Sequence, residues 1–215
     1  MKVVTGKSIL KGIAIGRLKI YRREIGQASR TSTLTPEEEF ARFQSAQRAA
    51  QEQLGALYER ALDEVGEDNA AIFEIHQMML EDEDYVEAIQ GILDNQGATA
   101  EYAVTVTGEN FAAAFAAMED PYMQARSADV KDISCRVVNI LTGADRGAAQ
   151  GEEPAILVAD DLTPSETVQL DKSKLLGFIT RGGSTNSHTA ILARTMGIPA
   201  LIGVDFDDSW DGELA

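Results

Sequence analysis

The chain has 215 residues, of which 44% are hydrophobic and 25% charged, a composition typical of a folded globular protein. Its 35 acidic residues outnumber its 19 lysines and arginines, so the formal net charge is −16. Such a surface repels phosphate backbones, which argues against a nucleic-acid partner, and attracts a partner with a basic face.

Cysteine content and the N-terminal sequence indicate the cellular setting. A single cysteine, Cys135, excludes an internal disulfide and a cysteine-based zinc site and fits a reducing compartment. The N-terminus lacks the apolar region of a signal peptide, and no apolar stretch is long enough to span a bilayer. We therefore expect a soluble, cytoplasmic protein that does not enter a membrane.

The first predicted elements are strands. Residues 8–21 carry Ile13, Ile15, Leu18 and Ile20 among glycines and polar residues, a near-alternation that predicts one or two short strands. The stretch that follows, up to Thr33, is polar and without a pattern, so it is expected to be a connection.

Residues 34–143 predict an antiparallel helical bundle. Thr35 is followed by Pro36 and Glu38, which is a helix-start signature, and apolar residues then recur at helical spacing as far as Gly66. Gly108 is expected to weaken the middle of a later helix. The remaining helices are expected from Asp68 or Asn69 to Leu80, over 82–95, over 99–118 and over 120–141.

An α/β pattern follows a small, polar boundary after residue 143. Strands are predicted at 155–158, 176–180 and 200–203, and helices at 165–170 and 189–196. The predicted fold class is therefore α/β plus all-α, in which a split α/β domain of residues 1–22 and 144–215 is interrupted by the bundle. Residues 211–215 resemble the entrance of a strand, so we expect the sequence to be a fragment.

One segment before the last predicted helix combines residues suited to phosphoryl transfer. Two glycines allow positive φ and a close backbone approach, and hydroxyl and amide side chains follow them. A histidine in the first turn of a helix lies near free N–H groups and a positive dipole end, which favour an attached anion and a neutral imidazole. The segment consists of Arg181, Gly182, Gly183, Ser184, Thr185, Asn186, Ser187 and His188. From the residues alone, the alternative is a Gly-Gly turn with Ser187 as a helix cap and no chemistry at His188.

A resemblance to a known family favours the chemical interpretation. The run GGSTNSHTAILARTMGIPALIGV resembles the phosphohistidine signature of Enzyme I, pyruvate phosphate dikinase and phosphoenolpyruvate synthase. Four other segments resemble Enzyme I of the bacterial sugar phosphotransferase system in particular and occur in that family's order. They are SILKGIAIGRLKIY, AAIFEIHQMMLEDED, ARSADVKDISCRVV and VADDLTPSETVQLD. The sequence is thus similar to the N-terminal portion of the Enzyme I family, the phosphoenolpyruvate–protein phosphotransferases.

The resemblance implies a fold and an activity. It implies a swivelling phosphohistidine domain with an inserted helical domain that binds the phosphocarrier protein HPr. It also implies that His188 accepts a phosphoryl group from phosphoenolpyruvate and passes it to HPr, and that Thr167 orients His188. From the sequence alone, the favoured interpretation of Thr167 is a capping or surface threonine in a short helix. In the family, Mg²⁺ and phosphoenolpyruvate bind a C-terminal barrel outside this sequence, so no metal or cofactor is expected here.

The glycine segment departs from the family string G-G-R-T-S-H. One more residue separates the Gly pair from His188, and no arginine follows the glycines. We hypothesise that Arg181 provides the nearby positive charge instead.

The same resemblance places HPr on the second and third predicted helices. Expected partner contacts are His76, Met79, Glu83, Asp84 and Arg126. On composition alone, the acidic run Glu81-Asp82-Glu83-Asp84 is a solvated face and His76 a surface or half-buried helix residue.

Two other functions remain open from the sequence. One is the swivelling domain of a dikinase or synthase, although the helical insertion argues against it. The other is a non-catalytic helical interaction module in which the glycine segment is only a turn.

Overall fold

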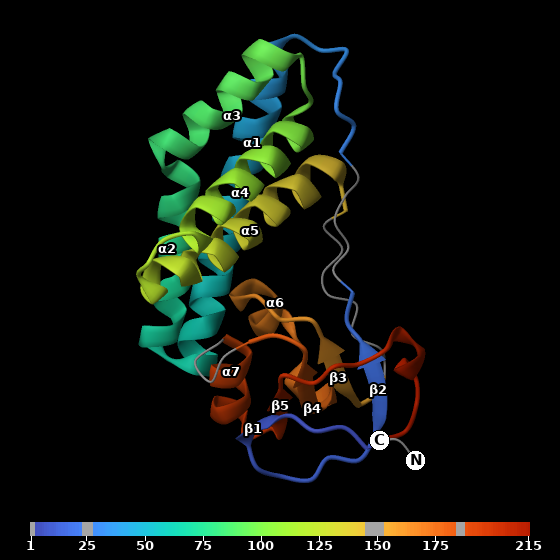
Figure 1. The fold of residues 1–215 in the computed structure, drawn as a ribbon. Coiled ribbons are helices and arrows are strands. Elements are labelled where there is room, and N and C mark those ends of the chain that lie inside the picture. The colour runs from blue at the N-terminus through green and yellow to red at the C-terminus, as the bar shows by residue number, and fades with distance from the viewer. Residues whose placement is uncertain (1–2, 23–27, 145–152, 184–187) are drawn as a thin grey trace. The chain divides into compact units, whose positions relative to one another are not determined.

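The computed structural model describes residues 3–22, 28–144, 153–183 and 188–215. The chain divides into two compact units, one made of residues 1–23 and 147–215 and the other of residues 24–146 (Figure 1). The first contains a mixed sheet with helices and the second is helical, so the predicted fold class is confirmed.

The described residues of the second unit form helices, joined by short links and preceded by a segment that bridges to Ala98 through Thr31. The first helix begins at a capping box, as predicted: the Thr35 hydroxyl accepts from the Glu38 amide at 3.3 Å, and the Glu38 carboxylate accepts from the Thr35 amide at 2.9 Å. The helices are α1 (Pro36–Val65), α2 (Glu67–Glu81), α3 (Glu83–Gln96), α4 (Ala100–Ala116) and α5 (Pro121–Thr142).

The start of α2 differs from the prediction that Asp68 or Asn69 caps it. Gly66, with φ +83°, ends α1 and directly precedes α2, and no side chain caps the new helix. The Asn69 side chain instead donates to the Val65 carbonyl at 2.8 Å. Because α2 begins directly after Gly66, this glycine occupies the cap position and Asp68 and Asn69 lie within the first turn of the helix.

Gly108 has a packing function in α4 rather than being a weak point. A Cβ at this position would lie 2.6 Å from the Ser134 Cβ of α5, closer than real Cβ contacts. The missing side chain therefore allows α4 and α5 to pack closely. Ser134 also lies 2.8 Å, Oγ to hydroxyl oxygen, from the buried Tyr85 of α3, which ties a third helix to this contact.

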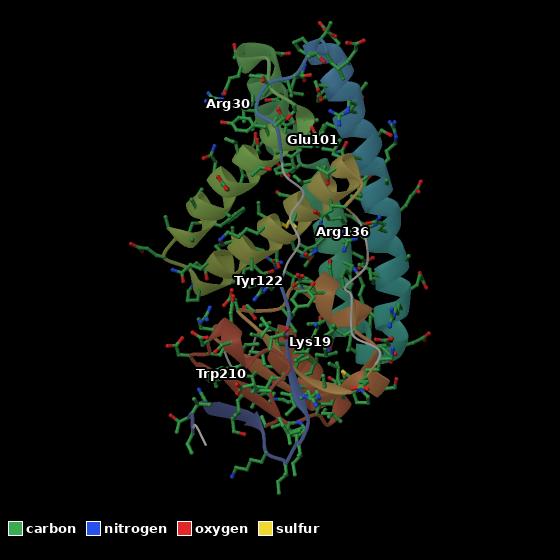
Figure 2. The ribbon with its side chains drawn as sticks, turned by 90° about the vertical axis from the view of Figure 1, so that its right-hand side faces the viewer. Lys19, Arg30, Glu101, Tyr122, Arg136 and Trp210 are labelled. Carbon is green, nitrogen blue, oxygen red and sulfur yellow. The ribbon has the colours of Figure 1, made fainter. Side chains whose placement is uncertain are left out.

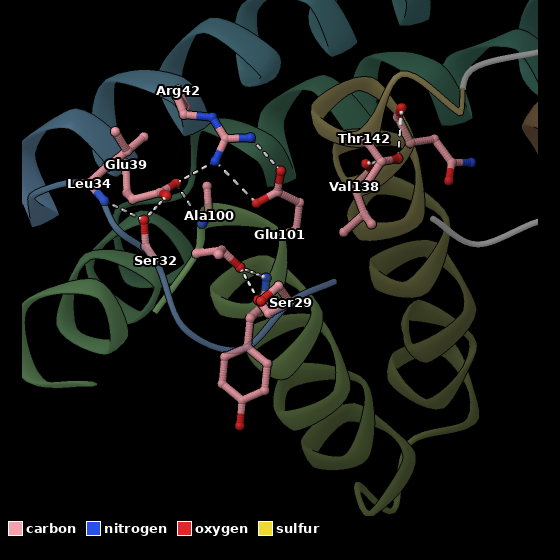
Figure 3. Close-up of polar contacts among 12 residues, drawn as sticks. Ser29, Ser32, Leu34, Glu39, Arg42, Ala100, Glu101, Val138 and Thr142 are labelled. Carbon is pink, nitrogen blue, oxygen red and sulfur yellow. Dashed lines mark hydrogen bonds and ion pairs between the residues drawn. The ribbon is translucent and has the colours of Figure 1, made fainter. Parts of the chain in front are cut away.

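The segment before α1 is fastened to the bundle by hydrogen bonds, although its sequence is without pattern (Figure 3). The Ser32 amide donates to the Gly97 carbonyl at 3.0 Å, and the Ser32 hydroxyl donates to the Glu39 carboxylate. Glu39 also accepts from the Ala100 amide at 2.9 Å and from Arg42 at 2.6 Å. The described part of the expected connection is thus an ordered component of the helical unit.

The first unit is built on a five-stranded sheet of order β1-β5-β4-β3-β2. Strands β2 to β5 run parallel in that sheet, and β1 is antiparallel to β5. Two helices, α6 (Pro164–Gln169) and α7 (His188–Met196), belong to the same unit. The strands are β1 (Lys7–Leu10), β2 (Arg17–Ile20), β3 (Ala155–Ala159), β4 (Leu175–Thr180) and β5 (Ala200–Ile202).

One face of the sheet packs on the residues after β5. Ile20, Ile156 and Val158 form a buried cluster with Phe206, and Trp210 packs against it (Figure 2). Alternate residues of β2, such as Lys19, are exposed, as the period of a strand requires.

The residues after Trp210 line the outer edge of β2. The Leu18 amide donates to the Glu213 carbonyl at 2.8 Å, and Gly16 exchanges two hydrogen bonds of 2.9 Å with Ala215. The Ile20 amide donates to the Asp211 carboxylate at 2.8 Å. The predicted strand entrance therefore pairs antiparallel with β2.

Candidate functional site

The candidate site lies at the carboxyl ends of β3 and β4, where neighbouring parallel strands end at one edge of the sheet. The pairing continues past the last strand residues, because the Arg181 amide donates to the Ala159 carbonyl at 3.1 Å and the Gly182 amide donates to the Asp160 carbonyl at 2.7 Å. The Thr180 hydroxyl donates to the Gly182 carbonyl at 2.9 Å. The first residues of the glycine segment are thus held by the sheet.

The two glycines serve different purposes. Gly183 has φ +93°, a backbone conformation that residues with a side chain rarely adopt. The positive φ predicted for this segment is therefore present. A Cβ at Gly182 would lie 3.1 Å from the Asp160 carbonyl oxygen. The close approach that Gly182 permits is therefore to the chain's own backbone.

His188 is the first residue of α7, so its backbone lies at the N-terminal end of a helix, as predicted. Here free N–H groups and the helix dipole favour an anion and a neutral ring. The predicted loop residues Ser184, Thr185, Asn186 and Ser187 lie outside the described residues, so their assignment stays a prediction.

Thr167 lies in α6, which begins at a capping box formed by Thr163 and Glu166. Its side chain is buried, and its hydroxyl donates to the Pro164 carbonyl at 2.7 Å. With its proton used in this way, the hydroxyl oxygen can still accept a hydrogen bond from an imidazole N–H. α6 contacts α7 in this unit, so Thr167 and His188 lie on neighbouring helices. The pairing of Thr167 with His188 remains a prediction.

The guanidinium of Arg181 contacts two carboxylates, a carbonyl and an aromatic ring within its own unit. It forms ion pairs with Asp160 and, at 3.5 Å, with Asp205. It donates to the Phe206 carbonyl at 2.8 Å and lies over the Phe206 ring, 4.2 Å from the centroid. The cation expected to face a phosphoryl group is therefore already held by two carboxylates, a carbonyl and a ring.

The prediction that His76 contacts a partner is wrong. His76 is fully buried in the helical unit, with its ring nitrogens 3.4 Å from Asp129 and 3.6 Å from Asp132. Helical spacing explains the burial, because His76 shares the inward face of α2 with Phe73 and Leu80. This spacing is visible in the sequence and could have identified His76 as a core residue.

The other expected partner residues are accessible to different degrees. Glu83 and Asp84 are exposed in the first turn of α3, whereas Met79 is half-buried. Arg126 donates to Asp129 at 2.9 Å, and its guanidinium lies 4.6 Å from the centroid of the Tyr122 ring. Tyr122, which is 63% exposed, was not predicted from the sequence (Figure 2). Its large apolar ring in a helix start is the only sequence cue to an exposed contact.

Metal-binding clusters and helices able to span a membrane are both absent from the residues that the structure describes. Within that part of the chain, no group of three or more His, Cys, Asp or Glu side chains could hold a metal ion. None of the helices described is both long and apolar enough to cross a membrane.

Fold and site together define a class of protein: an α/β unit is interrupted by a helical unit, and the edge of its sheet leads through a glycine segment to a histidine that begins a helix. Comparison with known families identifies the class. Residues 5–126 match the family described as PEP-utilising enzyme, N-terminal, and residues 151–209 match PEP-utilising enzyme, mobile domain. The first match alone covers more than half of the chain, so the chain belongs to the phosphoenolpyruvate-utilising enzymes.

Similar proteins refine this assignment. The chain is 37% identical over 205 residues to a phosphoenolpyruvate-protein phosphotransferase of Bacillus sp. (strain S), covering 94% of this chain and 35% of that protein. It is 37% identical over 208 residues to that of Haemophilus influenzae, covering 94% and 36%. The chain thus spans about a third of the length of these relatives.

Two solved structures of Enzyme I proteins are similar to this chain in fold. A solution NMR structure of Enzyme I matches with a TM-score of 0.71 and 34% identity, over 94% of this chain and 82% of that one. The N-terminal domain of Enzyme 1 – Nitrogen matches with a TM-score of 0.65 and 28% identity, over 99% and 93%. The resemblance to the N-terminal portion of Enzyme I is confirmed.

Proposed function

We propose that His188 accepts a phosphoryl group derived from phosphoenolpyruvate and transfers it to HPr, as part of a phosphoenolpyruvate–protein phosphotransferase in the cytoplasm. The observation that supports this most directly is the position of His188 as the first residue of α7, after a glycine segment held at the carboxyl end of β4. The family membership and the similarity to named phosphotransferases agree with this role.

The proposed chemistry uses a neutral imidazole as the nucleophile. One ring nitrogen of His188 attacks phosphorus while the bond to the enolpyruvate oxygen breaks, and the phosphoryl group later moves to a histidine of HPr. Thr167 would accept a hydrogen bond from the other ring nitrogen and so fix the tautomer. The N-terminal end of α7 would stabilise the negative charge, because phosphoryl transfer depends mainly on positioning and electrostatics.

The family resemblance assigns phosphoenolpyruvate and HPr to different parts of the protein. The family resemblance places Mg²⁺ and phosphoenolpyruvate on a C-terminal barrel, and this chain spans only about a third of its relatives. We therefore propose that the 215 residues exchange phosphate with HPr but do not use phosphoenolpyruvate.

The helical unit would be the docking site for HPr. Its exposed Glu83 and Asp84, together with the half-buried Met79, offer acidic and adaptable apolar groups to a basic-rimmed, apolar face. The net charge of −16 favours the encounter with such a partner.

Transfer from labelled phospho-HPr tests the proposal. We expect intact-mass analysis of the 215-residue chain to show one phosphoryl adduct, on the peptide that contains His188, and no adduct in the His188→Ala variant. Phosphoenolpyruvate alone should give none. Transfer only from a nucleotide would indicate a dikinase-like domain, and no transfer to the folded chain would indicate a non-catalytic module.

A further inference from the structure

The first residues of the glycine segment, Arg181 and Gly182, are held by the Arg181 side chain as well as by backbone hydrogen bonds. We propose that Arg181 is a positioning residue. Its side chain fixes the first residues of the glycine segment against the ends of β3 and β5, and it is not the cation that faces the phosphoryl group. The inference rests on the proposed function and replaces the role that the sequence suggested for Arg181.

The partners of Arg181 come from the segments that follow two other strands of the sheet. Its guanidinium joins Asp160, directly after β3, to Asp205 and Phe206, shortly after β5, while Arg181 itself directly follows β4. The three segments that leave the same edge of the parallel sheet are thereby linked by one side chain. Backbone contacts reinforce the link, since the Val204 amide donates to the Thr180 carbonyl at 3.1 Å.

All three nitrogens of the Arg181 guanidinium already have partners within the protein. Its Nε faces Asp205, one terminal nitrogen binds Asp160, and the other donates to the Phe206 carbonyl. One face of the group lies on the Phe206 ring. Three of the five N–H donors of the guanidinium are thus engaged, and the two carboxylates beside it weaken its attraction for a phosphoryl oxygen.

The contacts of Arg181 act on the local position of the glycine segment more than on overall stability. The Arg181 side chain is 46% exposed and Asp160 78%, so water screens the ion pair and it adds little to the overall stability. Its effect is local, because it restrains the residues that lead directly to Gly183 and onward to His188. Small displacements of a reacting group have large effects on rate. Greater mobility of the first residues of the glycine segment should therefore slow transfer without unfolding the unit.

Four variants test the role: Arg181→Ala, Arg181→Lys, Asp160→Asn and the double variant Arg181→Ala/Asp160→Asn. Arg22→Ala is the matched control, because Arg22 forms a comparably exposed ion pair with Asp208 at 3.0 Å in the same unit. The measurements are single-turnover transfer from phospho-HPr, its dependence on HPr concentration, and hydrogen exchange of the Gly182 amide.

For a positioning role, each single variant should slow the maximal transfer rate about ten- to 100-fold with unchanged half-saturation by HPr. The double variant should be no slower than Arg181→Ala, and the Gly182 amide should exchange faster in Arg181→Ala than in Arg22→Ala. Full activity of Arg181→Lys, with faster transfer in Asp160→Asn, would instead identify Arg181 as the phosphoryl cation and overturn the proposal.

The outcomes separate this inference from the proposed function. Failure of the unaltered chain to take up phosphate would contradict the function, whereas unchanged Gly182 exchange and unchanged rates in the variants would contradict only the positioning role. The exchange measurement needs no phosphoryl transfer, so it tests the link in either case.

Discussion

At the scale of single residues, Glu39 shows how a buried carboxylate is kept ionised. Burial raises its pKa, but hydrogen bonds from Ser32, the Ala100 amide and Arg42, with the charge of Arg42, outweigh that effect and lower the pKa below its ordinary value. The charged form of Glu39 therefore connects the segment before α1, α1 itself and the start of α4 (Figure 3).

Replacing Glu39 with glutamine should destabilise the chain by roughly 1–3 kcal/mol at pH 7, because three donors lose a charged acceptor. A lowered folded-state pKa gives stability that is present above the unfolded value of about 4.3 and is lost as the pH falls through the folded value. Urea unfolding of Glu39→Gln and the unaltered chain should therefore converge on acidification. Glu37→Gln, at an exposed position in the same helical turn, is the control, and an equal effect of both would contradict the account.

At the scale of elements, the contact of α4 with α5 depends on an absent side chain. A Cβ on Gly108 would meet the Ser134 Oγ at 2.4 Å and its Cβ at 2.6 Å, so one of the two helices would have to move. Alanine is the better helix former by about 1 kcal/mol, yet a core that is already packed resists an added methyl group by more than that.

We expect Gly108→Ala to lower the free energy of unfolding by about 1–2 kcal/mol, measured by urea titration. Gly91→Ala in α3 is the matched control, since a Cβ there meets nothing within 4 Å. It should raise stability by up to about 1 kcal/mol. A stabilising effect of Gly108→Ala would refute the packing argument.

The elements also show what local sequence can predict. The start of α1 at Thr35 and the ends of α3 and α5 at Gly97 and Gly143 follow from capping residues a few positions away. The packing role of Gly108 and the α5 partners of His76 depend on the helix packed against them, which no local signal in the sequence specifies.

The candidate site divides in the same way. The position of His188 at the start of α7 was predictable from the glycines and the helical pattern after them. The partners of Arg181 were not, because Asp160, Asp205 and Phe206 are more than 20 positions away in the sequence and meet Arg181 only when the parallel strands align.

At the scale of the whole molecule, the acidic surface should control how fast a basic partner arrives. Charge reversal of Glu83 and Asp84 to lysine should slow association with HPr about tenfold at low salt and flatten its salt dependence, because long-range attraction is lost. Stopped-flow measurement over a range of ionic strength checks this. Reversal of Glu52 and Glu59, exposed on α1, changes the net charge equally and is the control. Equal slowing by both pairs would contradict a docking surface at α3.

The pairing of residues 211–215 with the edge of β2 has a consequence for self-association. Gly16, Leu18 and Ile20 have their outward backbone groups occupied by Ala215, Glu213 and Asp211. A chain shortened before Asp211 would leave these amides and carbonyls unbonded along the edge of β2. A second molecule could then add its own strand to that edge. Oligomers joined edge to edge are therefore the expected fate of such a truncation.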